Sequence, residues 1–214
     1  PLPDQPLTST HAPLILPPDA RLELTPTPDQ QADAARLLES ARVAPDEAFA
    51  ILNPGGNNPA KRWPADRFAQ VADHLRQRHG LRVLINTAPT EIEIARAIVD
   101  GAQTDPVPLA DHASSLGALL PLCARASVMV TNDTGPRHIA AAMGAPLVSL
   151  FGPTDPRWTT IPVRALADGR PSEVVVAADP DLPIDQSAND HPQRCAVDRI
   201  TTDRVTGAID SLLC

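Results

Sequence analysis

The chain has 214 residues, of which 43% are apolar, 21% are charged and only 2% are aromatic. This length suits one domain or slightly more, with a core built from aliphatic side chains. The net charge of −8 at pH 7 argues against a general binder of nucleic acid or of anionic membranes, so any anion site should be local.

The N-terminal part is expected to differ from the rest of the chain. Prolines are frequent over residues 1–28, which predicts an extended arm or the end of a connector, and the composition of Gln30–Arg42 favours a helix. The first residues lack the basic and apolar regions of a signal peptide. We therefore divide the chain into a proline-rich connector with a leading helix (1–47) and one folded domain (48–214).

From Ala48 onward, short apolar runs alternate with segments of helical periodicity. Five strands are predicted, at residues 48–52, 81–86, 127–131, 146–151 and 173–177. A helix with Pro64 in its first turn follows the first strand, and its apolar face comprises Phe68, Val71, Ala72 and Leu75.

Further helices are predicted between the later strands. One covers residues 91–100, and a short one covers 136–143. Between them, Ser114 or Ser115 can cap a helix whose apolar face comprises Leu116, Leu119, Leu120 and Cys123. The inward face of a closing helix comprises Val205, Ala208, Ile209 and Leu212.

The alternation of strands and helices predicts an α/β fold, a Rossmann-like parallel sheet with helices on both faces. Such open sheets bind ligands beyond the carboxyl ends of their strands. Residues that directly follow strands are therefore the candidates for a functional site.

The first candidate is the segment NPGGNNPAKRWP, Asn53–Pro64, after the first strand. Gly55 and Gly56 permit positive φ angles and a close backbone approach to a ligand. Lys61 is the only lysine of the chain, and its flexible ammonium can follow a phosphate that changes position. Alternatively, the segment is an ordinary loop with one solvated lysine.

The second candidate is TNDTGPRHIAAAMG, Thr131–Gly144, which runs from the third predicted strand into a helix. Asp133 or Thr134 can cap this helix, and Gly135 opens its backbone. Free N–H groups at a helix N-terminus bind anions, and His138 could donate a further hydrogen bond there. Alternatively, Asp133 only caps the helix and His138 packs or faces water.

Two weaker candidates follow the other strands. In LFGPTDP (150–156), Gly152 and Pro153 end a strand, and Thr154 and Asp155 could face the same crevice, although a turn without a ligand role is at least as good an explanation. After the second strand, Glu91 or Glu93 could accept hydrogen bonds from a ribose, or could simply favour the helix N-terminus.

Together these positions favour a nucleotide-phosphate crevice. No GxGxxG, GxxxxGK[ST] or GxSxG pattern is found, which argues against an NAD site, a P-loop and a serine hydrolase elbow. His191 and Cys195 could begin a metal site, but no second pair lies nearby. Three separate cysteines without a CxxC pair predict a reducing, cytoplasmic compartment.

Three stretches resemble the C-terminal half of family 9 glycosyltransferases, the bacterial ADP-heptose:lipopolysaccharide heptosyltransferases and their relatives. They are NPGGNNPAKRWP, TNDTGPRHIAAAMGAPLVSLFGPTDP and HPQRCAVDRITTDRV, and the resemblance runs from about Ala48 to the C-terminus. It implies one half of a GT-B fold, in which the C-terminal domain binds the nucleotide-sugar donor. The N-terminal domain, which binds the acceptor and supplies an aspartate as general base, is expected to be absent here.

The resemblance also implies roles for the candidate residues. Lys61 would contact the donor diphosphate and stabilise the leaving group, with Asp133 and His138 as further catalytic residues. The other donor-binding residues implied are Gly55, Gly56, Glu91 at the ribose, Ser114 near the adenine, Thr134 and Gly135 at the phosphates, and Gly152, Pro153 and Thr154 with less definite roles.

The implied donor is an ADP-sugar, ADP-heptose in the family, and the implied acceptor is the lipopolysaccharide core. No metal, cofactor or nucleic acid is expected, and any membrane association would be peripheral, at the inner face of the inner membrane. By itself this half would bind the donor without transferring sugar. Two alternatives stay open: a stand-alone nucleotide-sugar binding module, and another GT-B-type enzyme such as a sugar-nucleotide epimerase, which would prefer UDP ligands.

Overall fold

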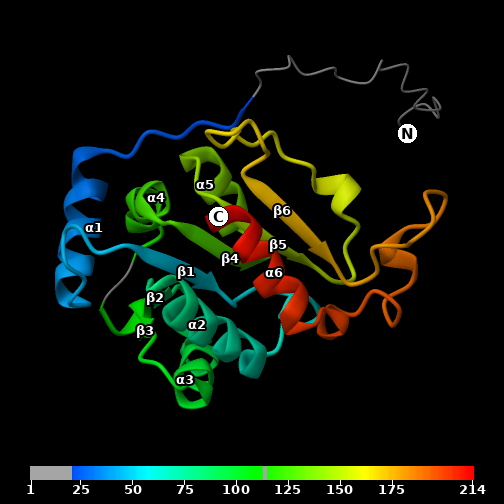
Figure 1. The fold of residues 1–214 in the computed structure, drawn as a ribbon, viewed down its shortest axis with the longest axis horizontal. Coiled ribbons are helices and arrows are strands. Elements are labelled where there is room, and N and C mark those ends of the chain that lie inside the picture. Colours follow the sequence, from blue (N-terminus) through cyan, green and yellow to red (C-terminus); the bar gives the residue numbers. More distant parts are fainter. Residues whose placement is uncertain (1–20, 113–114) are drawn as a thin grey trace, which may run out of the picture.

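Six short strands form one parallel sheet in the computed structural model, which describes residues 21–112 and 115–214. The strand order is β3-β2-β1-β4-β5-β6 (Figure 1). The strands are β1 (Phe49–Asn53), β2 (Arg82–Ile85), β3 (Val107–Pro108), β4 (Val128–Asn132), β5 (Leu147–Phe151) and β6 (Glu173–Ala177). This order is that of the doubly wound dinucleotide-binding fold, and it confirms the predicted fold class.

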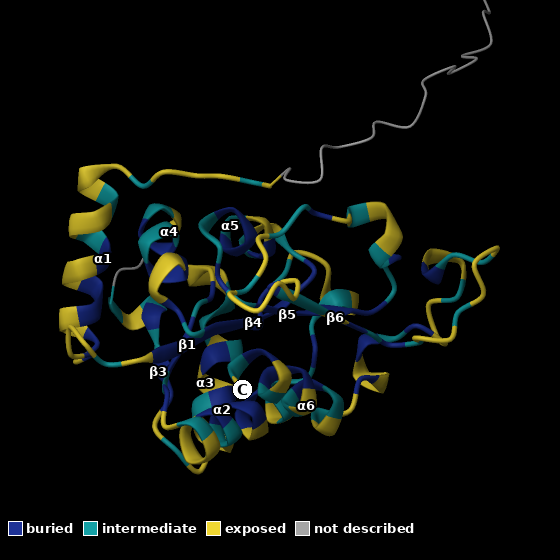
Figure 2. Cartoon of the chain, turned by 45° about the horizontal axis from the view of Figure 1, so that its top comes forward, coloured by how far each residue is buried: buried dark blue, intermediate teal, exposed yellow. Residues whose placement is uncertain are grey.

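Six helices cover the two faces of the sheet within the described residues. They are α1 (Pro28–Ser40), α2 (Ala65–His79), α3 (Ile92–Gly101), α4 (Leu116–Arg125), α5 (Gly135–Met143) and α6 (Thr202–Leu213). Helices α1, α4 and α5 lie on one face, and α2, α3 and α6 lie on the other (Figure 2). None of the described helices is long and apolar enough to cross a bilayer.

The alternation of side chains along the strands divides the core into two layers. In β1, Ala50 and Leu52 pack with α2 and α6, whereas Phe49 and Ile51 pack with α1 and α4. All four are fully buried, as expected for a central strand covered on both sides. The predicted inward faces of α2 and α6 are confirmed, since each of their four named residues is buried.

The leading helix α1 shares this core. Its N-cap Thr27 forms a capping box with Gln30, whose backbone N–H donates to Thr27 Oγ1 at 3.3 Å. The buried residues Ala34, Leu37 and Leu38 lie in the same cluster as Phe49. Residues 1–20 of the expected connector lie outside the described residues.

Three details of the predicted elements are corrected. The two-residue strand β3 was missed because it is too short to show periodicity, and its Pro108 is tolerated only because the strand lies at the sheet edge. Pro64 occupies the N-cap position before α2 instead of its first turn. In α4 the buried face is Ala118, Leu119, Leu122 and Cys123, whereas Leu116 is 66% exposed.

The shift in α4 follows from its cap. Ser115 Oγ accepts a hydrogen bond from Ala118 N at 3.1 Å, so the helix begins at Leu116 and its first residue projects beyond the core. The other predicted cap, Ser114, lies outside the described residues.

Candidate functional site

A cavity of about 580 Å³ lies at the carboxyl ends of β1, β2 and β4. Its wall is formed by residues 55–58, 86–89, 115–116 and 133–136, together with Asn53, Lys61 and Glu91. The strand order reverses between β1 and β4, and ligands of doubly wound folds bind at this switch point. The loops after β1 and β4, which the sequence singled out separately, therefore form one site.

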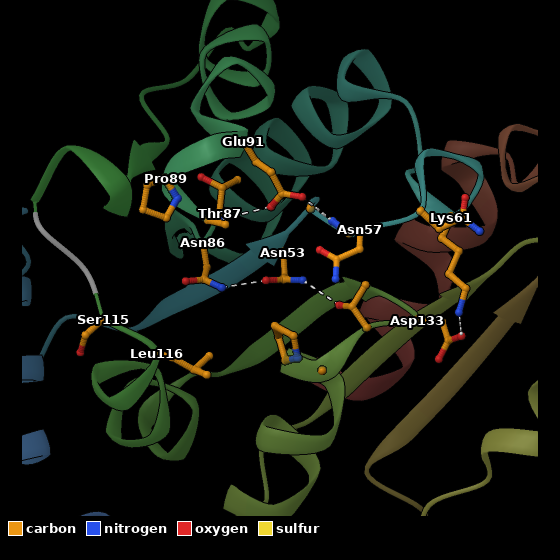
Figure 3. Close-up of a pocket in the computed structure, with 17 residues that line it drawn as sticks. Asn53, Asn57, Lys61, Asn86, Thr87, Pro89, Glu91, Ser115, Leu116 and Asp133 are labelled. Atoms are coloured by element: carbon orange, nitrogen blue, oxygen red, sulfur yellow. Dashed lines mark hydrogen bonds and ion pairs between the residues drawn. The ribbon is translucent and has the colours of Figure 1, made fainter.

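Lys61 lies at one end of the cavity, opposite Ser115 and Leu116 (Figure 3). It ends a short 3₁₀ turn, in which Lys61 N donates to Asn58 O at 3.0 Å. Its Nζ donates to Asp133 Oδ2 at 2.8 Å, and its side chain is only 26% exposed. Lys61 is therefore not an ordinary solvated lysine. Because an ammonium carries three donors, two are without a partner in the described part of the chain and can contact a ligand.

Asp133 holds this ammonium from the loop after β4. Its side chain is 6% exposed, and its other oxygen, Oδ1, lies 3.9 Å from Arg137 Nη1. Arg137 is itself buried and makes a two-pronged ion pair with Glu173, at 2.7 and 3.1 Å. The Asp133 carboxylate is thus located between two cations, which explains how a charged group is accommodated in this wall.

The N-terminus of α5 faces the same cavity. Thr134 occupies its N-cap position, but neither Thr134 nor Asp133 caps the helix through its side chain. The Thr134 hydroxyl instead accepts from Asn53 Nδ2 at 3.2 Å and donates to Asn132 O at 3.3 Å. Within the described residues, the N–H groups of Thr134 and Gly135 donate to no backbone acceptor. These two donors are available to an anion.

Glu91 closes another part of the wall by binding the loop after β1 at Gly56. Its Oε1 accepts from Gly56 N at 2.8 Å and lies 3.3 Å from Arg62 Nη2, while its Oε2 accepts from Ala88 N at 3.3 Å. A Cβ at position 55 would lie 2.1 Å from Glu91 Oε2. Neither Gly55 nor Gly56 has a positive φ angle, so it is close approach, and not backbone conformation, that favours glycine at position 55, where a Cβ would displace the Glu91 carboxylate.

The sequence prediction missed a layer of polar side chains at the strand ends. Asn86 Nδ2 donates to Asn53 Oδ1 at 2.7 Å, and Asn53 Nδ2 donates to Thr131 Oγ1 at 3.2 Å. Thr87 also lines the cavity, and its buried Oγ1 has no hydrogen-bond partner among the described residues. Their positions in the sequence could have indicated them, because Asn53 stands at the end of one apolar run and Asn86 follows another.

Some predicted residues do not lie in this site. Among the described residues that line the cavity, His138, Gly152, Pro153 and Thr154 are absent. His138 is exposed on α5, because position 138 points away from the sheet while Arg137 points into it. Gly152 packs against Val197, where a Cβ would lie 2.6 Å from the valine Cβ.

Asp155 follows in the same loop after β5 and is only 1% exposed. Hydrogen bonds from the Arg157 side chain lower the pKa of Asp155 to about 2, against the effect of burial. Its carboxylate also accepts from the backbone N–H groups of Arg157 and Ala188. The loop after β5 therefore forms a structural ion pair instead of a wall of the cavity.

Comparisons with known proteins agree with this geometry. The family model for glycosyltransferase family 9 (heptosyltransferase) matches residues 18–171. Lipooligosaccharide heptosyltransferase 2 of Haemophilus influenzae is 36% identical over 141 residues, which cover 64% of this chain and 40% of that protein. Lipopolysaccharide heptosyltransferase 3 of Escherichia coli is 33% identical over 122 residues, or 56% of this chain and 35% of that protein. The matched stretch thus covers well under half the length of each of these relatives.

Two solved structures show the same fold. A family 9 glycosyl transferase from Veillonella parvula superposes with a TM-score of 0.71 at 23% identity, over 90% of this chain and 54% of that one. The Escherichia coli ADP-heptose LPS heptosyltransferase II superposes with a TM-score of 0.65 at 24% identity, over 89% and 53% of the two chains. The match to one half of these longer chains fits the predicted half of a GT-B fold.

The family match covers more than half of the chain, and the resemblance of three stretches of the sequence had predicted the same family. The chain belongs to glycosyltransferase family 9, the heptosyltransferase family.

Proposed function

We propose that this chain is the donor-binding half of a heptosyltransferase of lipopolysaccharide core biosynthesis, which binds an ADP-sugar and stabilises the departing ADP. The observation that carries the proposal is the cavity at the switch point, where the Lys61 ammonium and the free N-terminus of α5 line the same wall. The membership in family 9 supports the reaction class, and ADP-heptose is the donor we infer.

The diphosphate is proposed to lie at the Lys61 end of the cavity. Two donors of the ammonium and the N–H groups of Thr134 and Gly135 would contact its oxygens, with further support from the helix dipole of α5. The Asp133 carboxylate would not touch the phosphates, because two anions repel. Its role would be to orient Lys61 through the 2.8 Å hydrogen bond.

The nucleoside is proposed to lie at the opposite end. Leu116 lines the cavity and is 66% exposed, so an adenine could cover apolar surface that the protein core leaves open. The Thr87 hydroxyl, buried and unpartnered among the described residues, could donate to the nucleoside. Glu91 could accept from a ribose hydroxyl, since a carboxylate has lone pairs beyond the bonds it already makes.

The chemistry assigned to this half is stabilisation of charge. When the acceptor hydroxyl attacks the anomeric carbon, the sugar–phosphate bond breaks and negative charge develops on the ADP oxygen. Lys61 and the α5 N-terminus would stabilise that charge through donors that are already in place. A second domain would supply the general base and bind the lipopolysaccharide acceptor. The transfer would take place at the cytoplasmic face of the inner membrane.

Calorimetric titration with ADP and with an ADP-sugar tests this proposal. In Lys61→Ala, the affinity for ADP should fall by about 1.5–3 kcal/mol, or roughly tenfold to a hundredfold, because a charge-assisted contact is lost. Arg96→Ala removes an exposed cation from α3 and serves as the matched control, with no expected effect. We also expect the affinity to be unchanged by a chelator, since no metal is predicted in the donor site.

Equal ADP affinity in the wild type and in Lys61→Ala would contradict the role of Lys61. A clear preference for UDP over ADP would favour an epimerase-like enzyme instead. Joining this chain to an acceptor-binding domain should produce sugar transfer, whereas donor binding with no activity in any such assembly would favour the stand-alone binding module.

A further inference from the structure

Three potential metal ligands converge far from the donor cavity, on helices α2 and α6. They are His74 and His79 of α2 and Asp210 of α6, and their ligand atoms all lie within 4.8 Å of one another. His74 Nε2 and His79 Nε2 each lie 2.7 Å from the same atom, Asp210 Oδ1. The two imidazole rings meet edge to face, with centroids 5.4 Å apart.

This cluster lies near the amino ends of the strands, at the opposite end of the sheet from the cavity. Helix α2 begins just after the carboxyl end of β1 and ends just before the amino end of the parallel strand β2. His79, its last residue, is therefore about 20 Å along the helix axis from Ala65, at a rise of ~1.5 Å per residue. The cluster does not take part in donor binding, and no role in sugar transfer is assigned to it.

The environment of the three side chains favours a cation. The cluster lies near the C-terminal ends of both α2 and α6, where the aligned peptide dipoles leave partial negative charge. Asp210 Oδ1 is the common partner of both imidazoles, so a carboxylate oxygen and two ring nitrogens already face one another.

Access for an ion is also possible. The side chains of His74, His79 and Asp210 are 24%, 14% and 39% exposed, so the ligand atoms are partly shielded yet reachable from solvent. Two cations at this end of the sheet are engaged elsewhere, since Arg76 donates to Gly80 O, and Arg170 donates to Ser211 O and pairs with Asp168.

We propose that His74, His79 and Asp210 form a binding site for a divalent transition metal ion, with Zn²⁺ as the preferred ion. The bound ion would join the closing helix α6 to α2. Two imidazoles and one carboxylate are typical zinc ligands, and water would complete a four-coordinate site. Magnesium and calcium are disfavoured because they prefer oxygen ligands.

The two nitrogen–oxygen separations require only a small adjustment. Ligand atoms about 2.0–2.2 Å from a tetrahedral zinc ion lie roughly 3.3 Å from one another. The present nitrogen–oxygen separations of 2.7 Å would thus widen by about half an ångström, within reach of side-chain rotation. The ion would replace two hydrogen bonds to one carboxylate with direct bonds from all three ligands.

Titration of the complete 214-residue chain with Zn²⁺, with free metal removed by dialysis, tests the site. We expect one zinc ion to be retained per chain and the melting temperature to rise with Zn²⁺ but not with Mg²⁺. A Co²⁺-loaded sample should show the visible absorption of nitrogen and oxygen ligands, without the near-ultraviolet band of a thiolate. Such a band would assign the ion to a cysteine and overturn the proposal.

Substitutions of the ligands sharpen the test. Loss of a residue that only supports a metal ligand typically weakens metal binding by about 10- to 100-fold. Asp210→Asn and His79→Gln each remove a ligand, so each should weaken zinc binding by at least this factor and should abolish the rise of the melting temperature with Zn²⁺. His112→Gln removes a histidine outside the cluster and should change neither. Absence of zinc binding in the wild type, or equal binding in Asp210→Asn, would overturn the proposal, and the wild-type result stands even if a variant does not fold.

Discussion

The loops after β4 and β5 are similar in sequence and different in use. Each has a glycine, a proline and a threonine close to an aspartate, and each aspartate is buried and pairs with a cation. Asp133, after β4, holds Lys61 at the wall of the cavity, whereas Asp155, after β5, binds Arg157 outside it. Of these two loops, only the loop after β4 adjoins the switch point of the sheet. A buried aspartate–cation pair therefore lines the cavity after β4, whereas after β5 it stabilises the packing of a loop.

The largest effect that would test this comparison is expected at Asp155. Asp155→Ala removes the acceptor of the Arg157 side chain and of the buried Ala188 N–H, so the free energy of unfolding should fall by about 2–4 kcal/mol. Urea denaturation measures this loss. Asp168→Ala, which breaks an exposed pair with Arg170, is the control and should cost little. A tenfold loss of ADP affinity in folded Asp155→Ala would mean that this loop belongs to the donor site after all.

Gly152→Ala should also reduce stability, by roughly 1–3 kcal/mol. Its added Cβ would meet Val197 Cβ at 2.6 Å and the Val197 backbone at 3.0 Å, and such overpacking forces the loop to shift. Gly207→Ala on α6 is the matched control, because nothing lies within 4 Å of its new Cβ, and a small gain in stability is expected there. Thermal or urea unfolding of the two variants compares them directly; equal stabilities would contradict the packing role of Gly152.

Acid should weaken the loop after β5 through Asp155. Because its folded-state pKa is lowered to about 2, the contribution of Asp155 is fully present above its ordinary pKa near 4 and is lost as the pH falls towards 2. We expect this contribution to be about 1–2 kcal/mol, since solvent around the partly exposed Arg157 screens the pair. The free energy of unfolding, measured at pH 5, 4, 3 and 2, should fall more steeply with decreasing pH in the wild type than in Asp155→Ala.

The smallest effect is expected at Asp133, and it should appear in binding. Asp133→Asn keeps the shape of the side chain but weakens its hold on Lys61, so ADP affinity should fall about three- to tenfold, or roughly 0.6–1.4 kcal/mol. Calorimetry measures the change, and Asp155→Asn is the matched control with no expected change in ADP affinity. If Asp133→Asn binds ADP more tightly, the carboxylate repels the diphosphate more than it orients Lys61.

The elements themselves were largely predictable from local patterns. The four apolar positions on α2 and on α6 recur at helical spacing, and all of them are buried. The strand β3 and the buried face of α4 were not predictable in the same way. The first has only two residues, and the second depends on whether the helix begins after Ser114 or after Ser115.

The candidate site was predictable in part. Asp133, Thr134 and Gly135 directly follow β4, Lys61 and Glu91 lie in the segments that follow β1 and β2, and all five line the cavity. The partners of these residues were not evident, because Glu91 meets Gly56 and Lys61 meets Asp133 across 35 and 72 positions of sequence. The zinc ligands proposed on α2 and α6 were missed for the same reason, since Asp210 lies 131 positions beyond His79.

What the sequence by itself determined is the order of the helices and of the strands other than β3, the family, and part of the set of polar residues that follow strands. Periodicity and short motifs are local properties, so they can be read without knowing how the strands are arranged. Only the tertiary structure decided which of these residues meet, because strand order places β1 beside β4 and puts β5 one strand further from the switch point. It thereby paired Lys61 with Asp133, left Gly152 and Thr154 outside the cavity, and brought two histidines and Asp210 together near the amino ends of the strands.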